Sequence, residues 1–250
     1  MLHFVGRGSA FSEGNTSAFF VDGTDFIIID SGLNLFQRLR HIDISSLLTE
    51  EGIKRIVVLI THTHSDHIGS LPLVIQYAYY FLHIPVVVIS GNNEILEDLR
   101  FYIENLGGCV PDAYELRVAS SEDFHWFKKI IPTEHSPELK GKCFGYLLEI
   151  EGVPTIYSGD TNVIEPFKEY IEEYADKGLE LYIEMAVSDS PVHLCIDKHM
   201  DYLKCIKEKG AKVYLMHIDN EEEMLKKIEG TGFEFAPLYP AINVEPLVVK

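Results

Sequence analysis

The sequence predicts a layered α/β fold, because short apolar runs rich in β-branched residues alternate with longer amphipathic segments in both halves of the chain. Histidine and aspartate residues gather where predicted strands end, and an α/β sheet usually presents its active site there. The 250 residues contain no low-complexity linker and no strong internal repeat. A chain of this length buries a sizeable core, so we expect one domain over residues 1–250, although length alone leaves two domains open.

The predicted elements form two similar sets. In the N-terminal half, strands are expected at Val5, Ala18–Val21, Phe26–Ile29, Ile56–Ile60 and Val86–Ile89, and helices at Leu33–Leu48, Ile68–Leu82 and Asn92–Glu104. In the C-terminal half, strands are expected at Tyr146–Ile150, Thr155–Ser158, Leu181–Met185 and Val213–Met216, and helices at Ile164–Asp176, Lys198–Lys209 and Glu221–Glu229. The segment Leu106–Ser121, rich in glycine and turn-forming residues, is expected to be a lid over a pocket or a loop at a subunit contact.

Residues 61–69 read Thr-His-Thr-His-Ser-Asp-His-Ile-Gly and directly follow a predicted buried strand. His62 and His64 point the same way on an extended segment, so both can reach one cation. Asp66 and His67 lie where the chain turns and can face a second cation beside it. Four potential ligands this close together favour a metal site over a polar loop, and imidazole with carboxylate suits zinc, manganese or iron.

This motif resembles that of the metallo-β-lactamase-fold hydrolases, and four further segments match the family in the same order. They are Phe26–Gly32, His135 in Thr-Glu-His-Ser-Pro, Asp160 in Tyr-Ser-Gly-Asp-Thr, and His217 after Val213–Met216. The resemblance runs from Gly6 to about Asp219. It implies a metallo-β-lactamase fold, which is an αββα sandwich of four layers.

The resemblance also implies a dinuclear metal site with room for a water between the two ions. The first ion would be bound by His62, His64 and His135, and the second by Asp66, His67 and His217. Asp160 would be shared between them. Asp30 is expected to orient a ligand histidine rather than to bind a metal itself.

Other segments resemble the phosphodiesterase branch that includes the transfer-RNA 3′-processing enzyme RNase Z. These segments are Gly6–Phe11, Glu13–Ser17, Gly145-Tyr146 and Tyr157–Thr161. In that branch an acid and a histidine help hold the phosphate and protonate the leaving oxygen. Glu184 and His193 match this pair loosely, so we expect them to be catalytic, with a purely structural role as the alternative.

Two features argue against transfer RNA as the substrate. RNase Z carries a long arm between the third and fourth ligand motifs, whereas here only 25 positions separate His135 from Asp160, enough for two strands and a turn. The 39 acidic and 21 basic residues give a net charge of −18, and no basic cluster is larger than the pairs Lys128-Lys129 and Lys226-Lys227. A polyanion binder gains most of its affinity from lysine and arginine, so a small substrate is favoured.

The chain therefore resembles the small phosphodiesterases that cleave cyclic mononucleotides, most of all the anti-Pycsar proteins. The resemblance implies metal-dependent hydrolysis of 3′,5′-cyclic mononucleotides to nucleoside 5′-monophosphates, which would disarm cyclic-nucleotide anti-phage signalling. Asp66 would also manage the proton of the nucleophile, and His193, tuned by Glu184, would be the general acid. The alternatives are an RNase Z-like endoribonuclease, a lactone or thioester hydrolase of the same fold, and a nucleotide-binding or scaffold protein without turnover.

The expected cofactors are two divalent metal ions, with zinc first and manganese as the alternative. The expected partner is a small cyclic nucleotide, and the acidic composition argues against a long nucleic acid. A membrane is not expected either, because no apolar stretch is long enough to span a bilayer. The chain shows no secretory signal and four scattered cysteines, which favour free thiols and a cytoplasmic location in a bacterium or a phage-infected cell.

The family also implies a homodimer. The aromatic segment Tyr77–Phe81 is expected in the core or at a subunit interface, with base stacking as the alternative. The remaining histidines belong to no motif and are expected to be surface or packed residues: His3, His41, His83, His125 and His199.

Overall fold

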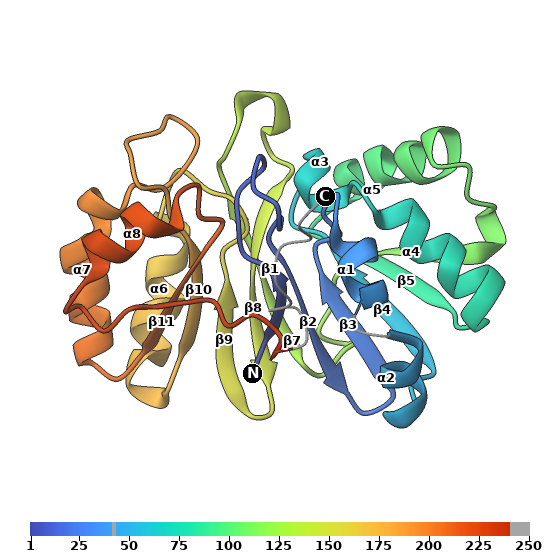
Figure 1. The fold of residues 1–250 in the computed structure, drawn as a ribbon, viewed down its shortest axis with the longest axis horizontal. Coiled ribbons are helices and arrows are strands. Elements are labelled where there is room, and N and C mark those ends of the chain that lie inside the picture. Colours follow the sequence, from blue (N-terminus) through green and yellow to red (C-terminus); the bar gives the residue numbers. More distant parts are fainter. Residues whose placement is uncertain (42–43, 241–250) are drawn as a thin grey trace, which may run out of the picture.

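A computed structural model describes residues 1–41 and 44–240 of the chain. Two sheets face each other, and each carries helices on its outer side, so the described residues form four layers in the order α, β, β, α (Figure 1). The predicted fold class and layering are confirmed. The carboxyl ends of the parallel strands lie at one edge of the sandwich, where the connecting loops gather.

The first sheet has six strands in the order β1-β2-β3-β4-β5-β6 within the described residues. They are β1 (His3–Gly6), β2 (Ser17–Asp22), β3 (Asp25–Ile29), β4 (Arg55–Leu59), β5 (Val86–Ser90) and β6 (Tyr114–Val118). Strands β3 to β6 are parallel to one another, whereas β2 pairs antiparallel with both β1 and β3. The last four residues of β4 are all buried, as expected of a central parallel strand covered on both faces.

The second sheet, over the same described part of the chain, has the order β12-β11-β10-β9-β8-β7. Its strands are β7 (Phe127–Thr133), β8 (Cys143–Ile150), β9 (Val153–Tyr157), β10 (Glu180–Glu184), β11 (Lys212–Met216) and β12 (Glu234–Phe235). Strands β7, β8 and β9 form an antiparallel meander, and β9 to β12 are parallel.

Helices cover the outer faces of both sheets (Figure 1). On the side of the first sheet lie α1 (Leu35–His41), α2 (Ile44–Glu50), α3 (Ser65–Ile68), α4 (Leu71–Tyr77), α5 (Asn93–Arg100) and the π-helical turns η1 (Ala78–Leu82) and η2 (Phe101–Leu106). On the other side lie α6 (Glu165–Tyr174), α7 (Ile196–Glu208) and α8 (Glu221–Ile228). Short 3-10 turns occur at η3 (Pro111–Ala113), η4 (Pro137–Leu139) and η5 (Ala175–Lys177).

Large aromatic side chains join the two sheets across the middle of the sandwich. Phe4 on β1 stacks on Tyr182 of β10 and Tyr157 of β9, with ring centroids 5.3 and 6.3 Å apart. All three side chains are fully buried. Since each such aromatic ring buries about 150–250 Å², this contact fixes the spacing of the two sheets and of the loops at their ends.

Some predicted elements differ from the structure. The segment Leu106–Ser121 contains η3 and the edge strand β6, so the expectation of a lid or loop over its whole length was wrong. Strands β7 and β12 were not predicted. The predicted helix Leu33–Leu48 contains α1 and the start of α2, and its residues 42–43 lie outside the described residues. The remaining predicted strands are observed near their expected positions.

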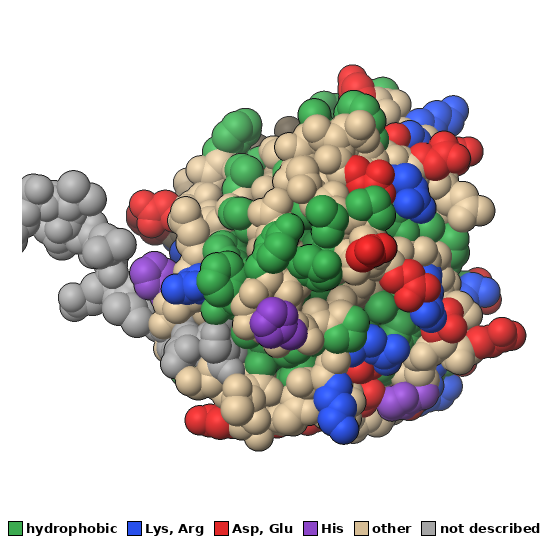
Figure 2. Space-filling model, turned by 90° about the vertical axis from the view of Figure 1, so that its right-hand side faces the viewer, with side chains coloured by type: hydrophobic (Ala, Val, Ile, Leu, Met, Phe, Trp, Pro, Cys, Tyr) green, Lys and Arg blue, Asp and Glu red, His purple; other side chains and the backbone are tan. Residues whose placement is uncertain are grey.

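Exposed apolar side chains gather on the outer helices of the first sheet. We call this group the apolar face; it consists of Leu73, Tyr79, Tyr80, Phe81, Phe101 and Leu106, on α4, η1 and η2. Figure 2 shows apolar side chains clustered over this side of the molecule. The exposure of Tyr79, Tyr80 and Phe81 excludes them from the core of the chain.

Candidate metal centre

The loop after β4 places the histidine-rich motif at the carboxyl edge of the first sheet. After Leu59 the chain stays extended through His64, and a single helical turn, α3, then begins. The His64 carbonyl accepts the amide hydrogens of His67 and Ile68, which fixes this turn. Asp66 and His67 are thereby buried, while His64 keeps partial exposure.

The structure brings the seven expected metal ligands into two neighbouring groups. The first group is His62, His64 and His135, and the second is Asp66, His67, Asp160 and His217. Within each group the ligand atoms lie within 4.8 Å of one another. The members come from four places in the chain, each just after a strand: the ends of β4, β7, β9 and β11.

One oxygen of Asp160 lies between the two groups. Its Oδ2 is 3.8 Å from Nε2 of His62 and 3.7 Å from Nε2 of His135, which belong to the first group. The same oxygen is 3.3 Å from Nε2 of His67 and 3.2 Å from Nε2 of His217, in the second group. The carboxylate is therefore placed where a ligand shared by two cations would have to be.

Two imidazole nitrogens in the centre fit a metal better than they fit a purely protein environment. Nε2 of His62 and Nε2 of His67 are buried and have no hydrogen-bond partner. A buried polar atom left unpaired costs about 1–3 kcal/mol. Coordination to a cation would satisfy both nitrogens, so the donor set fits divalent metal ions.

Asp30 lies behind the centre and orients His67. Its Oδ2 is 2.9 Å from Nδ1 of His67, and its carboxylate accepts hydrogen bonds from the backbone and hydroxyl of Thr61. Burial raises the pKa of Asp30, and although burial alone would lower the pKa of His67, Asp160 and Asp30 raise it. With Nδ1 bound to Asp30, Nε2 of His67 is the nitrogen that faces the other ligands, which matches the orienting role expected from the sequence.

The backbone at two positions of the centre is left-handed. Asp30 has φ of 59° and His217 has φ of 54°, which non-glycine residues adopt at a cost. The backbone amide of His217 donates to the Thr16 hydroxyl, 3.1 Å away, and this bond holds the histidine at the end of β11. Thr16 and Thr61 were not identified from the sequence, because only contacts distant along the chain reveal them.

Glu184 and His193 lie side by side next to the expected ligands. Glu184 ends β10, is fully buried, and its Oε1 accepts the amides of Thr161 and Leu194 while lying 3.3 Å from Nδ1 of His193. The His193 ring centroid is 4.9 Å from that of His135 and 5.1 Å from that of His217. Burial opposes the charged form of His193, but Glu184 outweighs it and raises the pKa to about 9.

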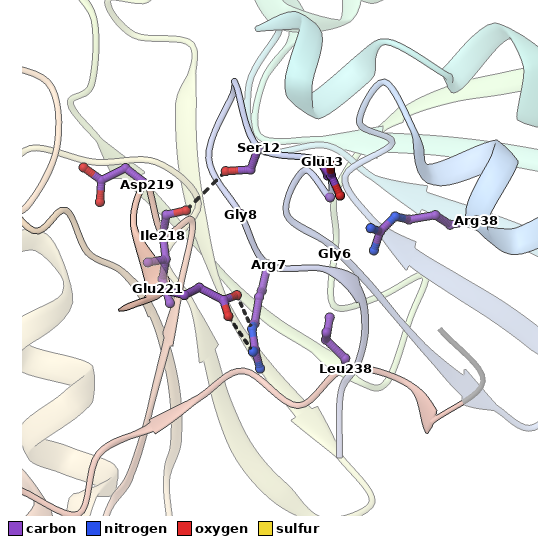
Figure 3. Close-up of a pocket in the computed structure, with 11 residues that line it drawn as sticks. Gly6, Arg7, Gly8, Ser12, Glu13, Arg38, Ile218, Asp219, Glu221 and Leu238 are labelled. Atoms are coloured by element: carbon purple, nitrogen blue, oxygen red, sulfur yellow. Dashed lines mark hydrogen bonds and ion pairs between the residues drawn. The ribbon is translucent and has the colours of Figure 1, made fainter. Parts of the chain in front are cut away.

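A cavity of about 260 Å³ lies beside the centre, but none of the expected ligands lines it. Figure 3 shows that Arg7 and Glu221 form a bidentate ion pair inside it and that the Ser12 hydroxyl donates to the Ile218 carbonyl. Because these charges pair with each other, we do not assign the substrate to this cavity. The cavity is lined in part by the loop between β1 and β2.

The histidines outside the motifs take no part in the ligand groups of the described residues. None of the five, His3, His41, His83, His125 and His199, belongs to a cluster able to hold a cation there. His41, His83 and His125 are exposed, and His3 and His199 are partly buried. Their assignment as surface or packed residues is confirmed.

Two facing sheets with outer helices and a histidine-aspartate centre at the strand ends define a protein of the metallo-β-lactamase fold. The chain belongs to the family described as "Anti-Pycsar protein Apyc1", whose profile matches residues 1–236. The Anti-Pycsar protein Apyc1 of Bacillus phage BSP38 is 30% identical over 250 residues, which cover 90% of this chain and 92% of the relative.

Solved structures share the fold at lower identity. YhfI from Bacillus subtilis, a metallo-β-lactamase fold protein, is 13% identical with a TM-score of 0.67, and the match covers 94% of this chain and 95% of that one. The short form of human tRNase Z is 17% identical with a TM-score of 0.62, covering 95% and 96%. In the described part of this chain, no helix has the length and apolar character that crossing a membrane requires.

Proposed function

We propose that this protein is a dinuclear-metal phosphodiesterase that hydrolyses 3′,5′-cyclic mononucleotides to nucleoside 5′-monophosphates and so disarms cyclic-nucleotide anti-phage signalling. The observation that carries the proposal is the single Asp160 oxygen lying within 4 Å of imidazole nitrogens from both ligand groups. Membership of the anti-Pycsar family supports the substrate class, because it agrees with the resemblance to cyclic-mononucleotide phosphodiesterases that the sequence shows.

Two divalent cations, zinc in our proposal with manganese as the alternative, would be held by the seven side chains of the two groups, with Asp160 shared. When bound, such ions supply the positive charge that holds the phosphate and lowers the pKa of the attacking water. Burial opposes the ionisation of Asp66, but His217 and His67 keep its pKa below the ordinary value. Asp66 is thus ionised and suited to binding a cation, and in this proposal it also manages the proton of the nucleophile.

His193 is the proposed general acid. Glu184 accepts the Nδ1–H of His193, which leaves Nε2–H free to donate to the departing 3′ oxygen. The side chain of His193 is about one quarter exposed, at 24%, so a substrate can reach it, while Glu184 is fully buried and serves to orient it. The rings of His135 and His217 lie 4.9 and 5.1 Å from that of His193, which places the proposed acid next to the expected ligands.

The acidic surface favours a small substrate over transfer RNA. With 39 acidic and 21 basic residues, the chain has few cations with which to neutralise a polyanion. The connection from His135 to Asp160 contains η4 and the hairpin of β8 and β9, which leaves no room for a long arm.

We also propose that the protein forms a homodimer and that the apolar face is the contact. A contiguous exposed apolar patch on a protein surface usually marks an interaction site. Phe81 and Leu106 are 74% and 68% exposed, and burying them against a second copy would remove this apolar area from water.

A single domain over residues 1–250 and a cytoplasmic location remain predictions from the sequence.

The test is a turnover assay on purified protein with zinc or manganese. The substrates are cyclic AMP, GMP, CMP and UMP, a transfer-RNA precursor and a generic lactone, with products separated by chromatography. We expect 5′-monophosphates from cyclic nucleotides, no cut in the transfer RNA, and loss of activity with EDTA that returns with metal. Cleavage of the lactone alone would assign the protein to the ester hydrolases, and cutting of the RNA alone to the endoribonucleases.

A further inference from the structure

The loop between β1 and β2 is tied firmly to the backbone beside the metal centre. The amide of Ser9 donates to the Ile218 carbonyl at 3.1 Å, and the amide of Ile218 donates to the Arg7 carbonyl at 3.0 Å. Ile218 directly follows the expected ligand His217, whose own amide is bound by Thr16 at the other end of the loop. Both ends of this loop therefore contact the strand end that carries a ligand.

Side-chain amides stiffen the same loop from within. Nδ2 of Asn15 donates to the carbonyls of Ser9 and Ala10, each at 3.1 Å, so it closes the loop across its width. From outside, Asn34 accepts the amide hydrogen of Asn15 and donates to the Glu13 carbonyl at 2.7 Å. The residues between Ala10 and Glu13 are thus held at the tip of a well-braced turn.

The loop also lies against the segment that supports Asp66. A Cβ placed on Gly32 would meet the Asp66 carbonyl at 2.3 Å and the Asn15 Cβ at 2.8 Å, so a glycine at this position allows the loop and the Asp66 segment to lie close together. Leu33 follows this glycine and reaches Gly69, at the far end of the histidine motif. Loop and segment together form one rim of the metal centre.

Two exposed apolar side chains stand on this rim. Phe11, at the loop tip, is fully exposed, and Leu33 is 54% exposed. They differ from the apolar face, whose members lie on the outer helices, because both belong to loops at the carboxyl edge of the first sheet. Phe11 is two residues from Ser9, so its Cα lies within about 8 Å of the Ser9 Cα and hence close to the strand end that carries His217.

We propose that Phe11 is the platform on which the nucleobase of the substrate stacks, with Leu33 as a second exposed apolar side chain on the same rim, an inference that rests on the proposed function. The phosphate of a cyclic nucleotide would be held by the cations, and its base must then lie some distance away along the rim. The base is the uncharged, flat part of the molecule, so an apolar ring suits it and the acidic surface does not repel it. Stacking on an aromatic side chain tolerates any base, because every base has a π-face.

The hydrogen bonds that fix the loop explain how an exposed ring on it can add to the affinity for the substrate. A ring on a loose loop would lose conformational entropy when it ordered against a base, whereas this loop is already fixed by its hydrogen bonds. Phe11 has no packing partner to lose, since its side chain is fully exposed. Its replacement therefore leaves the fold and the metal ligands in place.

The experiment measures KM and kcat of Phe11→Ala for cyclic nucleotides and for methyl ribofuranoside 3′,5′-cyclic phosphate, which lacks a base. We expect KM for the nucleotides to rise about tenfold, the loss of one stacked base, with kcat unchanged. The base-free compound should show no change in either constant. Phe11→Trp should restore a low KM, and Leu225→Ala, which removes an exposed apolar side chain from α8, should leave every constant unchanged.

A binding signal separates stacking from indirect effects. The chain has one tryptophan, Trp126, which is buried, so the fluorescence of Phe11→Trp over that of the wild type reports on position 11. Quenching by cyclic nucleotide but not by the base-free compound is the expected result. An unchanged KM in Phe11→Ala, or an equal rise for both kinds of substrate, would overturn the platform alone. No hydrolysis of any cyclic nucleotide by the wild type would overturn the proposed function, and the platform with it.

Discussion

At the scale of single residues, Asp160 is the group on which the two halves of the centre depend. Its Oδ2 lies within 4 Å of four imidazole nitrogens, two in each ligand group. Removing this carboxylate would therefore remove the one negative charge that both groups share. The expected ligands were predicted from a compact motif and its family resemblance. Thr16 was not, because it contacts His217 from 201 positions away in the chain. A single sequence gives no signal for such a contact.

We expect Asp160→Ala to lower kcat/KM by about a thousandfold or more, because in the proposed mechanism several kcal/mol of transition-state stabilisation would depend on two cations that share Asp160. Elemental analysis should show that less than two metal ions per chain remain, and circular dichroism should show an intact fold. His125→Ala, which changes an exposed histidine outside the centre, is the matched control. Full activity of Asp160→Ala after metal depletion would contradict the dinuclear proposal.

Replacement of His193 tests its role as general acid. His193→Ala should lower kcat on cyclic nucleotides by about 10²–10⁴-fold without changing the bound metal. A phosphodiester with a p-nitrophenolate leaving group needs no protonation, so its hydrolysis should be affected far less. Equal losses on both substrates would show that His193 acts by shaping the site and not by donating a proton.

At the scale of elements, burial decided which strands the sequence could predict. Strands β4 and β5 are apolar on both faces and appear as continuous runs. By contrast, β6 is only partly buried and β7 contains two exposed lysines and a proline, so neither shows a clear apolar run. Both lie at the edges of their sheets, where one side of the strand lacks a neighbour and weaker patterns suffice.

The hairpin of β8 and β9 offers a test of local backbone conformation. Its two-residue turn, Glu151-Gly152, joins the paired residues Ile150 and Val153, and both turn residues have positive φ, 53° and 78°. A Cβ on Gly152 would meet nothing within 4 Å, so any cost comes from the backbone alone. We expect Gly152→Val to lower the free energy of unfolding by about 1–2 kcal/mol in urea titrations. Gly152→Asn, which tolerates this conformation, should cost clearly less, and equal losses would contradict the assignment.

At the scale of the whole molecule, the net charge of −18 acts on every anionic substrate that approaches. At low ionic strength this charge repels a cyclic nucleotide, and added salt screens the repulsion, because the Debye length falls from about 30 Å at 0.01 M to about 8 Å at 0.15 M. We therefore expect kcat/KM for cyclic nucleotides to rise about two- to fivefold over this range, with kcat at saturation unchanged. The measurement is a salt series in sodium chloride, repeated in tetramethylammonium chloride to remove specific effects of the cation. A fall in kcat/KM with salt in both series would instead indicate that the potential at the site is positive. Lysine and arginine side chains would then have to be concentrated around the site despite the acidic net charge.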